Sequence, residues 1–213
     1  MKLKGVIFDL DGVICFTDRF HYLAWKQAVD PLGVSFDEKI NDRLRGVSRE
    51  QSLEIILEKY DGQLSQEEKT TLCEKKNNIY KELLKTLSPK DVSEDVMYTL
   101  YELKRRGLKI AIGSSSKNTR FILEQLKILE LFDAVSDGNG LTKSKPDPEV
   151  FLKAADMLQL PPANCLVVED AESGIDAGNA GGFTTVGIGV AANYDKSDFK
   201  IQQLSDILRL NRV

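Results

Sequence analysis

The stretch VIFDLDG at residues 6–12 places two aspartates directly after a short apolar run. An apolar run that stops at a glycine predicts a buried strand, which ends here near Asp9. Because alternate residues of a strand point the same way, we expect Asp9 and Asp11 to face one site. Two like charges at the end of a buried strand need a partner, so this stretch predicts a functional site.

Beyond residue 94, apolar strands alternate with amphipathic helices. Expected strands cover residues 108–113, 134–136, 165–168 and 184–189, and expected helices cover residues 94–106, 117–128, 148–160 and 172–180. Such alternation predicts an α/β fold with a Rossmann-like, doubly wound parallel sheet, in which the strand of residues 6–8 should be buried.

Residues 17–87 contain no convincing strand, and we expect an all-helical cap inserted after the first strand of the sheet. Ser48 with Gln51 and Ser65 with Glu68 fit capping boxes that begin helices. A long helix over residues 65–87 is expected to bury one side, formed by Leu72, Ile79, Leu83 and Leu87. The predicted domains are therefore a core of residues 1–16 and 88–213 and a cap of residues 17–87. A cap inserted there is expected to cover the carboxyl ends of the strands as a lid.

A second acidic pair, Glu169 and Asp170, follows the apolar run CLVV. If both strands are central and parallel, this pair meets Asp9 and Asp11 at one edge of the sheet. Four carboxylates would repel one another unless a cation neutralised them. Oxygen ligands of this kind suit Mg²⁺, which typically meets phosphate groups.

Groups suited to phosphate follow two other expected strands. Residues 114–118, SSSKN, offer hydroxyls and backbone N–H groups at the start of a helix, which favours an anion. Lys145 precedes Pro146, which biases Lys145 toward an extended backbone. An aspartate can act as a nucleophile toward phosphorus, and its neighbour two residues on can exchange a proton with the reacting hydroxyl. Each motif alone is common as a loop, a turn or a helix cap; their order along the chain favours phosphoryl transfer.

This ordered set resembles the haloacid dehalogenase superfamily: DLDG at 9–12, then Ser114, Lys145 and the pair 169–170. The resemblance implies an Mg²⁺-dependent phosphotransferase with one ion per chain. Asp9 would be the nucleophile, while Asp11 would be the general acid/base and give a backbone carbonyl to the metal. Ser114 and Lys145 would bind the transferring phosphoryl group. Asp170 would be a metal ligand, with Glu169 beside it.

Four further segments, HYLAWK (21–26), GVSREQS (46–52), EKKNN (74–78) and SSSKN (114–118), are similar to the β-phosphoglucomutase family. That family interconverts β-D-glucose 1-phosphate and glucose 6-phosphate, with glucose 1,6-bisphosphate as primer and intermediate. The resemblance implies substrate-binding roles for Thr17, Trp25, Gly46, Val47, Ser48, Arg49, Ser52, Lys76, Ser115, Ser116, Lys117 and Asn118.

Some of these residues also have simpler interpretations. The resemblance implies that His21, the one histidine of the chain, supports Asp11 and the closed lid. The residues alone favour a packed histidine beside Trp25, four positions on. Lys76 alone would be interpreted as surface charge, and Arg49 as a solvated side chain. Phe16 stands where the family often has an acidic residue, which affects the expected hinge.

Composition narrows the function classes. A net charge of −4 argues against a general nucleic-acid binder, and no segment is apolar enough for a membrane span. Three dispersed cysteines indicate reduced thiols, so we expect a cytoplasmic protein, with a monomer as the default. The alternatives left open are a sugar-phosphate phosphatase of the same superfamily, a non-catalytic ligand-binding protein with this fold, and a receiver-like regulator.

Overall fold

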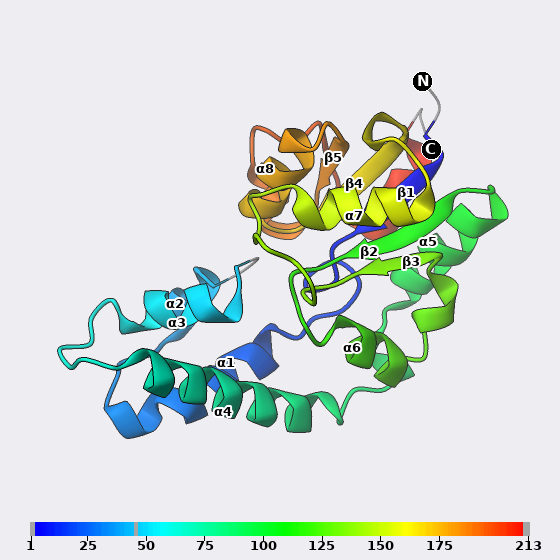
Figure 1. Cartoon of the computed structure of the whole chain (residues 1–213). Helices are drawn as coiled ribbons and strands as arrows, with labels where there is room; N and C mark the ends of the chain where they lie inside the picture. Colours follow the sequence, from blue (N-terminus) through cyan, green and yellow to red (C-terminus); the bar gives the residue numbers. More distant parts are fainter. Residues whose placement is uncertain (1–2, 45–46, 211–213) are drawn as a thin grey trace. The chain divides into compact units, whose positions relative to one another are not determined.

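A computed structural model describes residues 3–44 and 47–210 of the 213-residue chain. The chain divides into two compact units, one built from the residues up to Phe16 and from Ser88 onward, and the other from Thr17–Leu87 (Figure 1). We describe each unit by itself.

The first unit contains a six-stranded parallel sheet in the order β3-β2-β1-β4-β5-β6. The strands are β1 (Gly5–Phe8), β2 (Lys109–Gly113), β3 (Ala134–Ser136), β4 (Cys165–Glu169), β5 (Thr184–Gly187) and β6 (Phe199–Lys200). The predicted α/β fold is confirmed, and β1 lies in the middle of the sheet. We did not predict β6, because a strand of two residues has no periodicity to detect.

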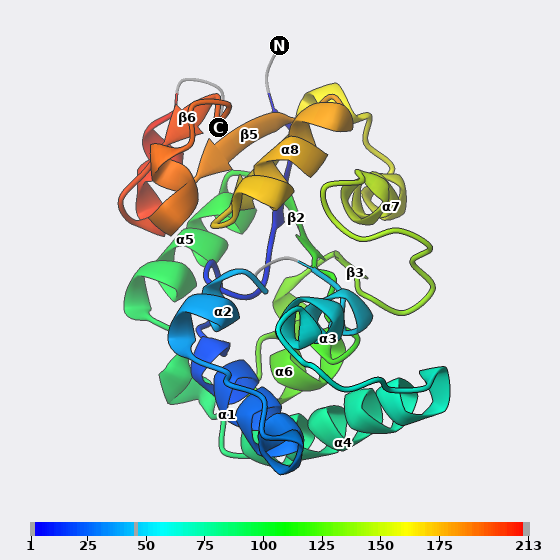
Figure 2. The same cartoon turned by 90° about the vertical axis from the view of Figure 1, so that its left-hand side faces the viewer.

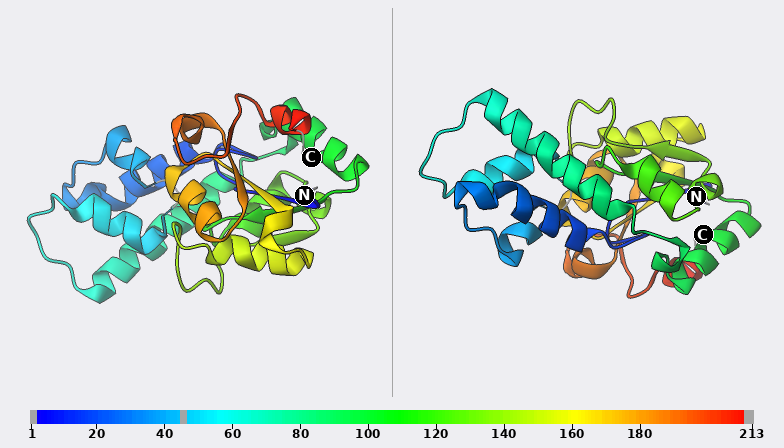
Figure 3. Two further views of the ribbon diagram at one scale, coloured as in Figure 1. Left: turned by 90° about the horizontal axis from the view of Figure 1, so that it is seen from above. Right: turned by 90° about the horizontal axis from the view of Figure 1, so that it is seen from below.

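Helices cover both faces of this sheet (Figure 3). They are α5 (Glu94–Arg105), α6 (Thr119–Gln125), α7 (Glu149–Leu158) and α8 (Glu172–Ala180). On one face, Phe151 of α7 and Ala177 of α8 belong to a core cluster with Ile7 and Val167 of the sheet. α5 packs against β2 and against a C-terminal 3₁₀ turn, η6 (Leu204–Arg209). Shorter 3₁₀ turns connect the other elements, namely η1 (Asp30–Leu32), η2 (Pro89–Asp91), η3 (Leu129–Leu131), η4 (Pro162–Asn164) and η5 (Gly189–Asn193).

Helix α6 is shorter than the predicted range of 117–128. The loop before it is held out of the helix by its own hydroxyls: Ser114 Oγ accepts a hydrogen bond from Ser116 N, and Ser116 Oγ accepts one from Asn118 N, both at 3.2 Å. At the other end, Lys127 has a left-handed φ of 57°, which ends the helical path.

The second unit is helical, as predicted for these residues. It contains α1 (Asp18–Val29), α2 (Glu38–Asp42), α3 (Arg49–Leu57) and α4 (Gln66–Leu84). Both predicted capping boxes are present, at Ser48 before α3 and at Ser65 before α4. α1 and α4 lie side by side (Figures 1 and 2). A core cluster joins their inner faces to α3 and consists of Trp25, Ala28, Val29, Phe36, Leu53, Ile56 and Cys73.

The predicted buried side of α4 is correct only in part. The buried residues of α4 are Cys73, Lys76, Tyr80 and Leu84, whereas Leu72 and Ile79 are partly buried against the core. The helix ends at Leu84 instead of 87, and Leu87 is buried beyond its end. A search for apolar residues misses this face because Lys76 and Tyr80 carry polar tips on long apolar stems.

Among the described residues, no helix has the length and hydropathy that crossing a bilayer requires.

Candidate active site

Strand register brings two acidic segments together at the carboxyl edge of the sheet. β1 pairs with β4 so that Phe8 lies opposite Val168, and Asp9 N donates to Val168 O at 2.9 Å. Asp9 therefore leaves the sheet beside Glu169, the last residue of β4. Asp170, the next residue after Glu169, adds a third carboxylate.

Asp9, Glu169 and Asp170 are all buried, and one carboxylate oxygen of each lies within 4.8 Å of the others. Such a set of hard oxygen donors fits a magnesium-like cation, which would remove their mutual repulsion. Gly12 faces the same cluster with a left-handed φ of +88°, and a Cβ at Gly12 would overlap the Asp170 carboxylate. The turn after β1 thus needs a glycine to bring Asp170 close.

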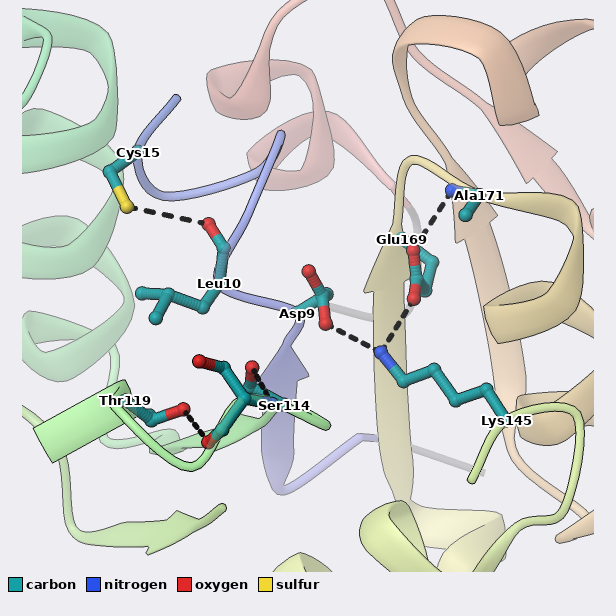
Figure 4. A network of polar contacts seen from close by, with 9 residues as sticks. Asp9, Leu10, Cys15, Ser114, Thr119, Lys145, Glu169 and Ala171 are labelled. Carbon is teal, nitrogen blue, oxygen red and sulfur yellow. Dashed lines mark hydrogen bonds and ion pairs between the residues drawn. The ribbon is translucent and has the colours of Figure 1, made fainter. Parts of the chain in front are cut away.

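Lys145 supplies a positive charge between two of these acids (Figure 4). Its Nζ donates to Asp9 Oδ1 at 2.5 Å and to Glu169 Oε1 at 2.6 Å, and only 1% of its side chain is exposed. The other oxygen of Glu169 accepts a hydrogen bond from Ala171 N at 2.9 Å. The Lys145–Pro146 peptide bond is cis. Lys145, Asp9 and Glu169 thus form a buried network in which each charge has a partner.

Burial dominates the protonation of this network. It raises the pKa of Asp9 from 3.8 to about 7, against the attraction of Lys145 and with the repulsion of Glu169 and Asp11. Burial opposes the charged form of Lys145, but attraction to Asp9 and Glu169 prevails and raises the pKa of Lys145. A further cation beside Asp9 would keep its carboxylate ionised near neutral pH.

Asp11 lies apart from the three-carboxylate set. It is half-buried, and the chain turns there to form a bridge between Asp11 and Cys15. Its charge nonetheless raises the pKa of Asp9 and that of Cys15. The Cys15 thiol itself is buried and donates to Leu10 O at 3.9 Å (Figure 4). Burial raises the pKa of this thiol well above its ordinary value, so we assign Cys15 no nucleophilic role.

The loop of residues 114–118 follows β2, which is the other neighbour of β1 in the sheet. Ser114 is 3% exposed and Asn118 is also buried, whereas Lys117 is exposed. Thr119 fastens the loop by donating to Ser116 O at 2.8 Å. Ser115 Oγ is a buried polar atom that has no hydrogen-bond partner within the described chain. A pinned loop with an unused hydroxyl can accept an anion without rearrangement.

Comparisons with known proteins agree with this geometry. Residues 3–182 match the haloacid dehalogenase-like hydrolase family. The chain belongs to this family. The resemblance inferred from the motifs is thereby confirmed, while the roles of the individual site residues stay predictions.

Three relatives are similar to this chain over most of their length. The chain is 42% identical over 207 residues to a β-phosphoglucomutase of Bacillus subtilis (strain 168), covering 96% of this chain and 92% of that protein. It is 30% identical over 188 residues to a phosphorylated carbohydrates phosphatase of Thermotoga maritima, covering 86% and 84%. A crystal structure of a β-phosphoglucomutase from Clostridium difficile superimposes with a TM-score of 0.91 at 36% identity, covering 96% and 93%.

The helical unit of this haloacid dehalogenase-like chain contains a second polar cluster, which surrounds Lys76. Lys76 is 3% exposed, its Nζ lies 2.9 Å from His21 Nδ1, and it sits over the rings of Tyr80 and Trp25, 4.5 and 5.3 Å from their centroids. Thr17, fully buried, pairs its hydroxyl with that of Tyr80 at 2.8 Å. Lys76 is therefore not a surface charge. Sequence analysis missed Tyr80, although its spacing of four residues from Lys76 on one helix was a usable signal.

Protonation of His21 follows from this cluster. Burial, the charge of Lys76 and that of Arg49, in that order, hold the pKa of His21 well below its ordinary value of 6.5. Lysine has only donors, so His21 Nδ1 accepts from Lys76 and the ring proton resides on Nε2. The His21 ring also packs on Tyr80, 4.2 Å between centroids.

Other predicted substrate-binding residues of this unit differ in exposure. Arg49 is half-buried at the start of α3 and donates to Asn77 Oδ1 at 2.9 Å. Ser52 is buried and donates to Ser48 O at 2.9 Å. Val47 and Ser48 are half-buried, whereas Gly46 lies outside the described residues. Trp25 is 1% exposed and belongs to the helical core, and its place on a sugar pocket stays a prediction.

Proposed function

We propose that this chain is a β-phosphoglucomutase that interconverts β-D-glucose 1-phosphate and glucose 6-phosphate. The observation that carries the proposal is Asp9 at the end of the central strand, paired with Lys145, in a chain that is 42% identical to the B. subtilis β-phosphoglucomutase over nearly its full length. The proposed reaction is phosphoryl transfer between a sugar phosphate and the enzyme, with glucose 1,6-bisphosphate as primer.

Asp9, Glu169 and Asp170, with the backbone carbonyl of Asp11, are the groups that we assign to an Mg²⁺ ion. The all-oxygen donor set and the mutual repulsion of its buried charges support this assignment. Bound there, the ion would neutralise the phosphoryl oxygens and the carboxylates together.

Asp9 is the proposed nucleophile. One of its carboxylate oxygens forms a bond to phosphorus while the bond from phosphorus to the sugar oxygen breaks, leaving an aspartyl-phosphate. Asp11 gives a proton to the departing oxygen, and in the reverse half-reaction it takes the proton of the attacking sugar hydroxyl. Lys145 and Ser114 hold the transferring phosphoryl group, and the backbone and hydroxyl groups of Ser115 and Ser116 complete its cradle.

A mutase must also hold a second phosphate away from the reacting one. We assign this task to Arg49, whose guanidinium can form two parallel hydrogen bonds to phosphate, and to the cation of Lys76. Lys117 and Asn118 of the α/β unit remain predicted substrate-binding residues. Substrate binding by Thr17, Trp25, Gly46, Val47, Ser48 and Ser52 remains a prediction, as does support of Asp11 by His21.

Mutase and phosphatase differ only in what attacks the aspartyl-phosphate. A sugar hydroxyl completes the mutase reaction, whereas water releases phosphate. The phosphatase is the second candidate, because a phosphorylated carbohydrates phosphatase of T. maritima is 30% identical to this chain.

One assay separates the two candidates. Purified protein with Mg²⁺ and glucose 1,6-bisphosphate receives β-D-glucose 1-phosphate, and glucose 6-phosphate and free phosphate are measured in parallel. We expect isomerisation to exceed phosphate release and the α-anomer to be a poor substrate. Phosphate release that outpaces isomerisation would favour the phosphatase. Asp9→Asn, which lacks a competent nucleophile, is the negative control for both products.

A further inference from the structure

Lys145 reaches the acidic cluster from a long connection, residues 137–148 between β3 and α7, which we term the lysine loop. Much of this loop is exposed, including Thr142 and Lys143, yet Lys145 is only 2% exposed. An exposed loop that delivers one buried cation needs something to fix its path, because loop backbone is otherwise free to open.

Glu149, the first residue of α7, provides this fixation on one side. Its Oε2 accepts hydrogen bonds from Thr142 N at 2.9 Å, Thr142 Oγ1 at 2.8 Å and Lys143 N at 2.8 Å. Its Oε1 accepts one from Lys153 Nζ at 2.7 Å, and Lys153 also donates to Gly140 O at 2.6 Å. One carboxylate and one ammonium on α7 thus hold three residues of the loop before Lys145, namely Gly140, Thr142 and Lys143.

The beginning of the lysine loop is hydrogen-bonded to the loop of residues 114–118. Gly138 N donates to Ser116 O at 3.0 Å, and Asn139 Nδ2 donates to Lys117 O at 3.1 Å. The lysine loop is therefore held over residues 138–143, the part that precedes Lys145.

An ordinary helix cap does not account for the contacts of Glu149. A capping side chain serves the free N–H groups of its own first turn. The amides that Glu149 accepts belong to residues six and seven positions earlier, outside α7. The pair with Lys153 has the helical i, i+4 spacing, but Lys153 also donates a hydrogen bond to the loop at Gly140 O. Both side chains therefore serve the loop.

The hydrogen bonds that Glu149 accepts also lower the pKa of its carboxyl group. Lys153, Thr142 and the amide of Lys143, in that order, lower the pKa of this carboxyl from 4.5 to about 2. A carboxylate held in this way keeps its charge at any pH where the enzyme would act.

We infer that Glu149, assisted by Lys153, is a positioning residue that holds the lysine loop so that Lys145 Nζ stays between Asp9 and Glu169. This inference rests on the proposed role of Lys145 in phosphoryl transfer. Glu149 itself touches neither the acids nor the proposed phosphoryl group in the described contacts, so its effect passes through Lys145.

A labelling experiment tests the inference without any assay of activity. Folded wild type, Glu149→Ala and Glu102→Ala receive a small amine-acetylating reagent in Mg²⁺-free buffer, and peptide mass mapping follows acetylation of Lys145 with time. Glu102 is a matched control, since its side chain is 14% exposed against 18% for Glu149 and it binds Arg105 and Arg106 on α5. Because three hydrogen bonds to the loop are lost, we expect Lys145 in Glu149→Ala to react at least about tenfold faster, with no change in Glu102→Ala. An unchanged rate in Glu149→Ala would overturn the inference.

A double-mutant cycle then tests whether the effect reaches the reaction. We expect Glu149→Ala to slow phosphorylation of Asp9 by about tenfold in the wild-type background and by less than about twofold in Lys145→Met. Equal losses in both backgrounds would mean that Glu149 does not act through Lys145. If Glu149→Ala does not fold, Lys153→Met, which releases one arm of the grip, takes its place. A wild type that transfers no phosphoryl group would refute the proposed function, while the labelling result would still decide the inference about the loop.

Discussion

The ammonium of Lys145 lies 2.5 Å from Asp9 Oδ1, although 136 positions of sequence separate the two residues. This pair joins the central strand of the sheet to the connection before α7. Lys145 is therefore the positive charge that pairs with the proposed nucleophile. Its attraction lowers the pKa of Asp9, but by less than burial raises it.

Lys145→Met should remove this countercharge while it keeps an apolar stem of similar length. Since the attraction of Lys145 lowers the pKa of Asp9, the substitution raises that pKa and leaves Asp9 and Glu169 to repel each other. We expect phosphorylation of Asp9 to slow by about 100-fold or more. Breaking a buried pair should also cost about 3 kcal/mol in free energy of unfolding without Mg²⁺, measured by urea denaturation. Lys196→Met, which breaks an exposed pair with Asp176, should change neither quantity appreciably. Wild-type phosphorylation by Lys145→Met would contradict the assignment.

Removal of one acid from the three-carboxylate set should weaken Mg²⁺ binding. Asp170→Asn replaces a charged oxygen ligand with a neutral amide, and we expect the Mg²⁺ dissociation constant to rise by at least about tenfold, measured by isothermal titration calorimetry. Chelation of the metal should abolish phosphoryl transfer by the wild type, and added Mg²⁺ should restore it.

Asp176→Asn is the matched control for this substitution. Asp176 also accepts hydrogen bonds, from Tyr194 and Lys196, but it stands outside the metal-type cluster. Equal Mg²⁺ affinity in Asp170→Asn and Asp176→Asn would exclude Asp170 as a ligand.

Arg49→Ala should separate the two phosphate tasks. The guanidinium is proposed to hold the distal phosphate, so we expect KM for β-D-glucose 1-phosphate to rise by about tenfold or more. Phosphorylation of Asp9 by acetyl phosphate, which has no second phosphate, should stay within about threefold of the wild-type rate.

Arg43→Ala provides the comparison for Arg49 within the helical unit. Arg43 forms an exposed bidentate pair with Glu58, and its loss should leave both rates near those of the wild type. If Arg49→Ala slowed labelling by acetyl phosphate as much as it slowed sugar turnover, Arg49 would not be a distal-phosphate residue.

His21 should titrate at unusually low pH. The chain has one histidine, so a single imidazole signal in an NMR titration reports this residue, and we expect its midpoint well below 6.5 because burial, Lys76 and Arg49 disfavour the cation. Below about pH 6.5, His21 is protonated in the unfolded chain but stays neutral in the folded chain. Folding stability should therefore fall as pH drops below about 6.5, by at most about 1.4 kcal/mol per pH step of one.

Lys76→Met identifies the source of this effect. Without the neighbouring ammonium, the midpoint of His21 should move upward, whereas Lys75→Met, on the exposed side of α4, should leave it unchanged. A wild-type midpoint at or above 6.5 would contradict the cluster around Lys76.

Local patterns predicted most of the elements. The capping boxes at Ser48 and Ser65 start α3 and α4 as expected, because a cap is a contact between residues three positions apart. Burial that depends on distant packing was not predicted. Lys76 is buried beside two aromatic rings and His21, and Trp25 is buried inside the helical core, neither of which follows from spacing along one helix.

By itself, the sequence determined the alternation of strands and helices and the polar residue that follows each strand, since hydrophobic period and turn chemistry act over a few neighbours. Only the tertiary structure decided that Lys145 bridges Asp9 and Glu169, that Asp11 stands apart from the acidic set, and that Glu149 holds the lysine loop. Those relationships depend on the order and register of β1 and β4 and on the path of one long connection. They arise when segments far apart in the chain are packed against each other, and no short stretch of residues contains that information.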